Sequence, residues 1–267
     1  MNKKLPWADK NLGQHFLRSE TVINSITEDF KDIAEAMIEV GPGPGILTEF
    51  LAKHELPFYV IEKDKRFPEY LEQFIKKDQI TLSDALEINL TNFFEEKEIS
   101  NKNIWLVSNL PYNVSVPLLI NFIQASEIKY MTLMFQREVA DKVINFMGKK
   151  KKSMGSLLCL SQTYFEVSVL CQAPPGAFQP PPKVDSTVIS FKRIEEPVIA
   201  LEDFRKFEGF LRKLFQFKRK QIGSVLKSYY TKEVFEAAFE SVGVSRTDRA
   251  EGFELETIQK LYKVLNP

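Results

Sequence analysis

Cysteine and histidine are scarce in this chain, whose 267 residues include only two of each. Cys159 and Cys171 lack the spacing of metal ligands, and two thiols in a chain of this length do not suggest a disulfide framework. We therefore predict no metal site. We expect both thiols to behave as small, partly buried apolar side chains.

Long hydrophobic runs are also missing. No stretch approaches the roughly 20 apolar residues that a membrane helix needs, and residues 1–16 lack the apolar core of a signal peptide. We therefore expect a soluble, cytoplasmic protein without a membrane partner. The length allows one large domain, or one large domain and a small one.

Charge of one sign is not in excess, because 36 basic residues balance 36 acidic residues. The overall charge therefore does not argue for a nucleic-acid partner. The distribution is more informative: residues 149–152 are four lysines, and residues 202–228 hold eight basic residues against three acidic ones, a local balance of +5. Such clusters fit contact with a polyanion, whereas the alternative is a solvated loop or helix face.

Short β-like runs alternate with helix-like patterns through the first two thirds of the chain. The segments between the runs repeat apolar residues at helical spacing. This alternation predicts a parallel α/β sheet with helices on both faces. The predicted strands are residues 36–40, 58–61, 80–82, 104–107 and 130–135.

The pattern then changes. A helix is predicted at residues 156–165, followed by two strands, residues 167–171 and 186–192, which a proline-rich connection joins into a hairpin at the sheet edge. Strand signals stop after this hairpin, and helical spacing continues to the end. We therefore predict two domains, an α/β domain over residues 1–197 and a small all-helical domain over residues 198–267.

A glycine-rich turn follows the first predicted strand. Residues 39–45 read Glu-Val-Gly-Pro-Gly-Pro-Gly, and glycine lets the backbone turn sharply and a ligand approach closely. Glu62 ends the second strand, 21 residues after Gly41, where an acid can hold the hydroxyl groups of a ribose. The turn and Glu62 together predict a nucleoside-type cofactor.

The spacing of the turn selects among such cofactors. It is Gly-x-Gly-x-Gly and not the dinucleotide pattern Gly-x-Gly-x-x-Gly. Pro42 and Pro44 remove two N–H donors that a pyrophosphate would use. Adenosine without phosphates fits better, so we predict S-adenosylmethionine. Asp84, after the third strand, could accept a hydrogen bond from the adenine amino group, or could be a helix N-cap or turn residue.

Residues 109–112, Asn-Leu-Pro-Tyr, end the fourth predicted strand, at the edge where ligands bind in open α/β sheets. The side-chain oxygen of Asn109 and the carbonyl of Leu110 can accept both N–H bonds of an exocyclic amine and stabilise the positive charge that grows on its nitrogen. Tyr112 can stack on the base. The motif predicts methylation of an amino nitrogen, with an ordinary strand-ending turn as the alternative.

Two further observations refine this hypothesis. Methylation of a cytosine ring carbon needs a cysteine nucleophile at this strand end, and neither cysteine is near. Phe178, in a proline-rich loop, could cover the other face of an extruded base, or could belong to the core of the hairpin.

The combined motifs resemble the ribosomal RNA adenine N6-dimethyltransferases, and most closely the branch that acts on small-subunit rRNA. The similar segments extend from near the start of the chain through the proline-rich loop, and the basic helical region is similar as well. These segments are residues 11–17, 39–43, 109–113, 136–140 and 178–186.

This resemblance implies a Rossmann-like class I methyltransferase sheet and dimethylation of the N6 amino groups of two adjacent adenosines. The adenosines lie in the 3′-terminal hairpin loop of small-subunit (16S) rRNA, within an assembling pre-30S particle. The implied cofactor positions are His15, Leu17, Gly41, Gly43, Glu62, Asp84 and Asn109. His15 stands where the family often has asparagine. The implied reaction-centre residues are Asn109, Leu110, Tyr112 and Phe178.

The resemblance also implies that the domain over residues 1–197 binds the cofactor and that the helical domain binds rRNA. We expect the protein to act as a monomer, and we expect its RNA contacts to include Lys149, Lys150, Lys151, Lys218, Arg219 and Lys220.

Three alternatives remain at this point. The first is the related large-subunit rRNA adenine methyltransferase of the macrolide-resistance type. The second is a DNA adenine methyltransferase, which the absence of a separate DNA-reading module disfavours. The third is a ribosome-assembly or transcription factor that has kept the fold without the catalysis, and retention of Glu62, Asp84 and the residue 109–112 motif argues against it.

Overall fold

The computed structural model describes residues 6–9, 13–144, 154–217 and 220–266. The predicted RNA contacts Lys149, Lys150, Lys151, Lys218 and Arg219 lie outside these ranges. The chain divides into two compact units, Met1–Ala140 with Val167–Arg193, and Asp141–Glu166 with Ile194–Pro267. The second unit thus includes residues 141–166 besides the C-terminal region. The functional division predicted at residue 197 stays a prediction, because compactness alone does not assign a function.

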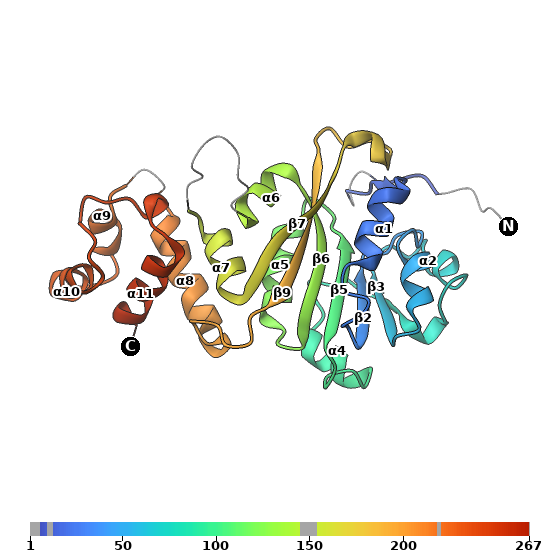
Figure 1. The fold of residues 1–267 in the computed structure, drawn as a ribbon, viewed down its shortest axis with the longest axis horizontal. Helices are drawn as coiled ribbons and strands as arrows, with labels where there is room; N and C mark the ends of the chain where they lie inside the picture. Colours follow the sequence, from blue (N-terminus) through green and yellow to red (C-terminus); the bar gives the residue numbers. More distant parts are fainter. Residues whose placement is uncertain (1–5, 10–12, 145–153, 218–219, 267) are drawn as a thin grey trace. The chain divides into compact units, whose positions relative to one another are not determined.

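The described part of the chain contains a sheet of seven strands (Figure 1). Its order is β4-β3-β2-β5-β6-β9-β7. The pairs from β4 to β6 are parallel, and β9 runs antiparallel to β6. The strands are β2 (Ala36–Val40), β3 (Phe58–Glu62), β4 (Ile80–Leu82), β5 (Ile104–Asn109), β6 (Ile128–Gln136), β7 (Phe165–Ala173) and β9 (Ser186–Arg193).

The predicted parallel α/β sheet is therefore confirmed, including the late strand pair at its edge. The apolar runs form strands because β-branched and aromatic side chains pack well on a pleated surface that is covered by helices. A second, two-stranded sheet was not predicted: β1 (Phe16–Leu17) pairs antiparallel with β8 (Phe178–Gln179). Strands of two residues are too short to produce a periodic pattern.

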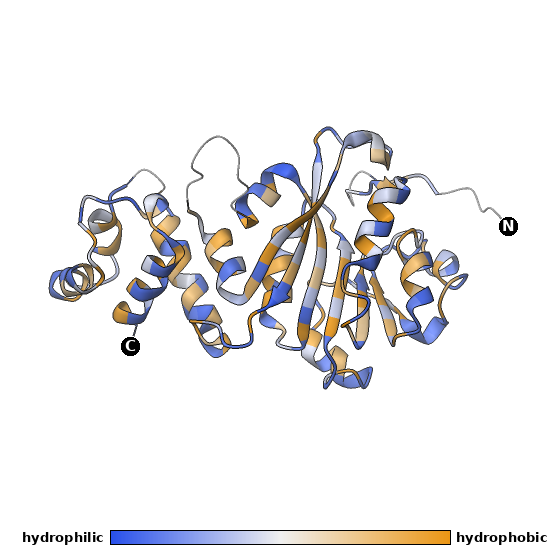
Figure 2. Ribbon diagram, in the orientation of Figure 1, coloured by the Kyte–Doolittle hydropathy of each residue, from blue (hydrophilic) through white to orange (hydrophobic). Residues whose placement is uncertain are grey.

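Helices connect the strands of the first unit and make up most of the second. Figure 2 shows that the helices carry both hydrophobic and hydrophilic residues, as expected for elements with one face in a core. The helices are α1 (Glu20–Glu28), α2 (Thr48–Leu51), α3 (Pro68–Leu71), α4 (Leu90–Glu96), α5 (Ser115–Gln124), α6 (Arg137–Val143), α7 (Ser156–Tyr164), α8 (Phe204–Phe215), α9 (Ile222–Leu226), α10 (Lys232–Val242) and α11 (Leu255–Leu265). In the part of the chain that is described, no helix is long and apolar enough to cross a membrane.

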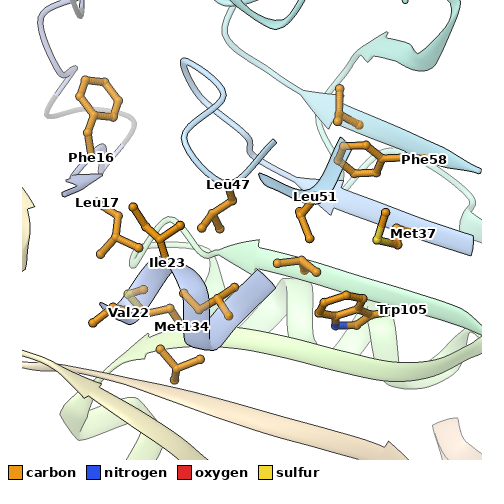
Figure 3. Packing of buried hydrophobic residues seen from close by; sticks show 14 of the residues in the cluster. Phe16, Leu17, Val22, Ile23, Met37, Leu47, Leu51, Phe58, Trp105 and Met134 are labelled. Atoms are coloured by element: carbon orange, nitrogen blue, oxygen red, sulfur yellow. The ribbon is translucent and has the colours of Figure 1, made fainter. Parts of the chain in front are cut away.

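The core of the first unit includes the N-terminal segment. Phe16 and Leu17 are buried together with residues of α1 and of the central strands. Figure 3 shows Leu17 and Ile23 near Leu47, with Trp105 farther along the sheet. The N-terminal segment is thus held in place by hydrophobic burial as well as by its pairing with β8.

The second unit has a core of its own. The helical spacing predicted around residues 204–215 is confirmed, and the buried positions of α8 include Phe204 and Phe207. The Phe207 and Tyr262 rings lie 5.0 Å apart in an edge-to-face arrangement. Gln259 donates a hydrogen bond of 3.0 Å to Thr163 Oγ1, which satisfies two buried polar groups.

Candidate active site

A pocket lies at the carboxyl ends of β2, β3, β4 and β5 in the first unit. From β2 the sheet extends to β3 on one side and to β5 on the other, so the strand order reverses here. Ligands of open α/β sheets bind at such a switch point. Residues that line the pocket include all seven predicted cofactor positions: His15, Leu17, Gly41, Gly43, Glu62, Asp84 and Asn109.

The glycine-rich turn needs its glycines for their backbone conformation. Gly41, Gly43 and Gly45 have φ angles of 68°, 57° and 91°, which lie in the left-handed region that side chains disfavour. At Gly45 a Cβ atom would also lie 2.8 Å from the Phe74 ring. The turn therefore brings bare backbone to the pocket, where a ligand can approach closely.

Glu62 ends β3 and fixes the glycine turn. Its side chain is 5% exposed. One carboxylate oxygen accepts a 2.8 Å hydrogen bond from the Gly43 N–H, and the other accepts a 2.7 Å bond from the Asp64 N–H. Burial raises the pKa of Glu62, and backbone N–H groups, those of Asp64 and Gly43 foremost, oppose that rise. A carboxylate has about four acceptor positions, so Glu62 can still accept hydrogen bonds from a pair of ligand hydroxyl groups.

Asp84 lies in the loop after β4 and already has protein partners. Lys63 Nζ lies 2.6 Å from one of its oxygens, and the Leu86 N–H donates a 3.0 Å bond to the other. The hydrogen bond from Lys63, followed by that from Leu86, lowers the pKa of Asp84 and keeps the group ionised. The bond to Leu86 is the turn contact considered as an alternative. Because Asp84 also lines the pocket, a further hydrogen bond from a ligand amine stays a prediction.

Asn109 lies at the end of β5 with its amide group fixed. Its Nδ2 donates a 3.1 Å hydrogen bond to the carbonyl oxygen of His15, which is 94 residues away in the chain. Since the two polar atoms of a planar amide point in different directions, Oδ1 is left to accept a hydrogen bond from a ligand in the pocket. Leu110 also lines the pocket, and its side chain is buried. Its buried side chain anchors the backbone that carries the second predicted acceptor.

Tyr112 is held from two sides. Its hydroxyl group lies 2.7 Å from Ser186 Oγ at the start of β9, and its ring stacks on the His15 ring with centroids 5.5 Å apart. Burial raises the pKa of the phenol, against a smaller opposing effect of Ser186, so the group stays neutral at physiological pH. His15 Nδ1 in turn lies 2.9 Å from the Pro180 carbonyl oxygen. His15 thus connects the N-terminal segment, the proline-rich loop and the end of β5.

Phe178 lies apart from the other predicted reaction-centre residues. It is 3% exposed, it pairs with Leu17 across β1 and β8, and it belongs to the hydrophobic core. It is not among the described residues that line the pocket. This placement matches the hairpin-core alternative. Contact between Phe178 and a base stays a prediction that requires the side chain to leave the core.

A polar network that the sequence does not reveal ties the N-terminal segment to the loop after β3. Gln14 Nε2 donates a 2.9 Å hydrogen bond to Asp64, and the Arg66 guanidinium donates to both Gln14 and Asp64. The pKa of Asp64 is lowered to about 2. The hydrogen bond from Arg66 contributes most to this shift, and the bond from Gln14 contributes less. Asp64 and Arg66 stand close to Glu62 in the sequence, but nothing in the pattern connects them with Gln14, 50 residues earlier.

Glu39 is the second buried carboxyl group at the pocket. It is 2% exposed and accepts a 2.6 Å hydrogen bond from Thr48 Oγ1. Its pKa is raised to about 8, chiefly by burial; the hydrogen bond from Thr48 opposes the rise and the negative charge of Glu62 adds to it. The group is therefore largely protonated at neutral pH. The largest cause of this shift is removal of the carboxyl group from water.

The shifted pKa of Glu39 predicts a pH dependence of stability. A carboxyl group whose pKa rises on folding destabilises the folded state progressively as the pH increases from its ordinary value of 4.5 to the folded value of about 8. Replacing Glu39 by glutamine removes this titration and keeps an acceptor for Thr48. We expect the difference in Tm, variant minus wild type, to increase between about pH 5 and about pH 8. A difference that does not vary with pH would contradict the assignment.

Comparison with known proteins finds matches that extend over nearly the whole chain. A family model described as ribosomal RNA adenine dimethylase matches residues 7–267. A protein named ribosomal RNA small subunit methyltransferase A from Clostridium botulinum (strain Okra / Type B1) is 36% identical over 259 residues, which cover 95% of this chain and 92% of that protein. The protein of the same name from Bdellovibrio bacteriovorus is 35% identical over 264 residues, with 96% and 92% covered.

Two solved structures share the fold. The crystal structure of the 23S rRNA methyltransferase ErmE has a TM-score of 0.70 at 23% identity, with 94% of this chain and 100% of that chain covered. A dimethyladenosine transferase from Plasmodium falciparum has a TM-score of 0.70 at 20% identity, with 92% and 96% covered. At these identities the likeness concerns the fold alone. It confirms the predicted Rossmann-like class I sheet.

Proposed function

The chain belongs to the ribosomal RNA adenine dimethylase family, and from this premise we propose that it dimethylates the N6 amino groups of two adjacent adenosines in small-subunit rRNA. The target is the 3′-terminal hairpin loop of that rRNA, in a pre-30S particle. S-adenosylmethionine is the methyl donor. The observation that carries the proposal is the meeting of Glu62 and Asn109 in one pocket at the switch point of the sheet.

The residues of the pocket fit this cofactor. Glu62 has acceptor positions for the ribose hydroxyl groups beyond those that Gly43 and Asp64 occupy. Gly41 and Gly43 present backbone without side chains to the pocket, and the prolines of the turn make it a poor pyrophosphate site. When bound, S-adenosylmethionine supplies an electrophilic methyl group on a positively charged sulfur.

The chain's own residues prepare the amine for transfer. The amine of adenine is a weak nucleophile, because its lone pair is delocalised into the ring. Asn109 Oδ1 and the Leu110 carbonyl accept its two N–H bonds, favour a pyramidal nitrogen and stabilise the positive charge that develops there. Tyr112 and His15 hold the base in line with the methyl group. The methylated ammonium is acidic and loses its proton to solvent, so the chain needs no strong base.

The small subunit is favoured over the large one as the substrate. The relatives at about 35% identity over most of the chain are named for the small subunit, whereas the large-subunit enzyme ErmE resembles this chain in fold alone. A non-catalytic assembly factor is disfavoured, because such a protein would not need Glu62 and Asn109 to be fixed in the pocket.

The partner is the rRNA of the small subunit, contacted through basic residues. Of the predicted contacts, Lys220 lies in the described part of the chain, in the second unit. The excess of positive charge in residues 202–228 supports an RNA-binding helical domain. A monomer acting in the cytoplasm fits this role.

The test of the function is methylation of purified ribosomal subunits. Small subunits that lack these methyl groups should accept labelled methyl groups from S-adenosylmethionine in the presence of the protein. Mass mapping of the rRNA should then place two methyl groups on each of two adjacent adenosines in the 3′-terminal hairpin loop. Labelling confined to the large subunit would refute the proposal.

His15 should act on the orientation of the base. Replacing His15 by alanine removes the stacking on Tyr112 and the hydrogen bond to Pro180, and we expect kcat/KM to fall about tenfold. Asparagine, which also donates a hydrogen bond, should restore part of the activity. Methyl transfer to small subunits under steady-state conditions measures both. An activity of His15→Ala equal to that of the wild type would mean that the side chain of His15 has no positioning role.

A further inference from the structure

Two large aromatic side chains of the second unit are exposed where its basic residues concentrate. Phe217 follows α8 and is 44% exposed, and Tyr229 follows α9 and is 41% exposed. By contrast, Phe204, Phe207 and Phe210 of α8 are buried. Packing of the helical core therefore explains the buried rings but gives no reason for Phe217 and Tyr229.

Each exposed ring lies beside a lysine ammonium group. Lys220 Nζ is 4.0 Å from the centre of the Phe217 ring, and Lys213 Nζ is 4.9 Å from the centre of the Tyr229 ring. The Tyr229 hydroxyl donates a 2.9 Å hydrogen bond to Gln216, the residue before Phe217. These contacts join the end of α8 to the segment after α9. We call the five residues, Lys213, Gln216, Phe217, Lys220 and Tyr229, the aromatic–lysine surface.

The positive charge of this surface differs from that of the rest of α8. Arg205 and Arg212 both pair with Glu208, at 3.4 and 2.7 Å. Lys206 likewise pairs with Asp203 at 3.0 Å. Within the described ranges, by contrast, Lys213 and Lys220 form no salt bridge with a carboxylate. The earlier cations of α8 thus have carboxylate partners, whereas the two lysines beside the rings do not in the part of the chain that the structure describes.

Rings and ammonium groups that alternate on a surface match the chemistry of single-stranded nucleic acid. Bases stack on aromatic rings without regard to sequence, because every base has a π face, and nearby lysines neutralise the phosphates. The exposed cation–π contacts are weak, so the lysines can turn from the rings to phosphates at little cost. A protein partner would more often meet a continuous apolar patch, and here cations interrupt the apolar surface.

We propose that the aromatic–lysine surface binds single-stranded RNA by stacking bases on Phe217 and Tyr229 while Lys213 and Lys220 contact the adjacent phosphates. The inference rests on the proposed function for its ligand class, RNA. It adds a second kind of recognition to the basic residues of the helical domain, since backbone contacts alone would not distinguish a base from an abasic site.

Binding of two probes to the full chain tests the proposal. One is a fluorescent oligouridylate of about 12 nucleotides, which matches the site size of small single-strand-binding modules. The other is an abasic ribose-phosphate chain of the same length. Uracil has no exocyclic amine, so neither probe depends on adenine chemistry. We expect the wild type to bind oligouridylate at least about fivefold more tightly than the abasic chain.

Matched variants separate stacking from charge. Phe217→Leu keeps the apolar bulk and removes the ring, and it should abolish most of the preference for bases without changing the salt dependence of binding. Val234→Ala removes an exposed apolar side chain of α10 that lies outside the surface, and it should bind like the wild type. Lys213→Gln with Lys220→Gln should instead reduce the slope of log affinity against log salt. Circular dichroism melting shows whether each variant is folded.

The outcomes are distinct. Loss of base preference in folded Phe217→Leu supports the proposal. An equal affinity of the wild type for both probes overturns the proposal. If that wild type still methylates small subunits, the proposed function stands. If Phe217→Leu keeps its base preference and loses affinity only for complete subunits over naked rRNA, the surface binds a protein and the proposal is wrong. If the wild type binds oligouridylate more tightly than the abasic chain but transfers no methyl groups, the proposed function is refuted and the proposal for this surface stands.

Discussion

Replacement of Asn109 by alanine is expected to slow methyl transfer about 100- to 1000-fold, the range observed when one group that stabilises a developing charge is removed. The variant loses the acceptor for the adenine amine and also the hydrogen bond that holds His15 over the pocket. Single-turnover transfer to small subunits, with the cofactor saturating, measures the chemical step directly. Affinities for the cofactor and for rRNA should persist at least in part, because Glu62 and the helical domain are unchanged.

The control for this experiment is Asn24→Ala, which removes the same side chain from an exposed position of α1. It should transfer methyl groups at the rate of the wild type. If Asn109→Ala did the same, the amide would not be an acceptor in the reaction. Loss of cofactor binding in Asn109→Ala would also contradict the assignment, since it would reveal a collapsed pocket and not a slowed chemical step.

Replacement of Glu62 by glutamine is expected to weaken S-adenosylmethionine binding about 10- to 100-fold. The carboxylate accepts the Gly43 and Asp64 N–H groups with separate oxygens, and glutamine can satisfy only one of them. The variant therefore loses a charge-assisted hydrogen bond inside the turn and the second acceptor for the ribose. Isothermal titration of the cofactor, in the absence of RNA, measures the loss.

Glu69→Gln is the matched control, because Glu69 lies at an exposed position of α3. Its cofactor affinity should equal that of the wild type. RNA binding should be unaffected in both variants, since neither position lies in the helical domain. An unchanged cofactor affinity in Glu62→Gln would contradict the role assigned to this carboxylate in the cofactor site.

The central strands β2 and β5 could be predicted because they are buried on both faces. In a chain where strand-like and helix-like segments alternate, a continuous apolar run such as residues 104–107 is typical of a buried parallel strand. The glycine turn was predictable for a related reason, because Gly41, Gly43 and Gly45 adopt a backbone conformation that other residues avoid. In both cases the local residue types restrict the structure directly.

The contacts that close the pocket could not be predicted in this way. Asn109 meets the backbone of His15 from 94 residues away, and Gln14 meets Asp64 from 50 residues away. Such bonds depend on where the N-terminal segment lies after β1 has paired with β8, and two-residue strands leave no periodic pattern. The same pairing places Phe178 in the core and not in the pocket, because Phe178 lies opposite Leu17 across β1 and β8.

The sequence by itself therefore determined the fold class, the cofactor turn and the residue types of the reaction centre, since each depends on local backbone and side-chain chemistry. It also indicated the sign of the charge in the helical domain. Only the tertiary structure showed that Lys213 lies beside the exposed ring of Tyr229, which follows a different helix. Only the tertiary structure showed His15 joining three segments at the pocket. Such arrangements depend on long-range packing, whose energy is shared among residues too far apart in the chain to form a pattern.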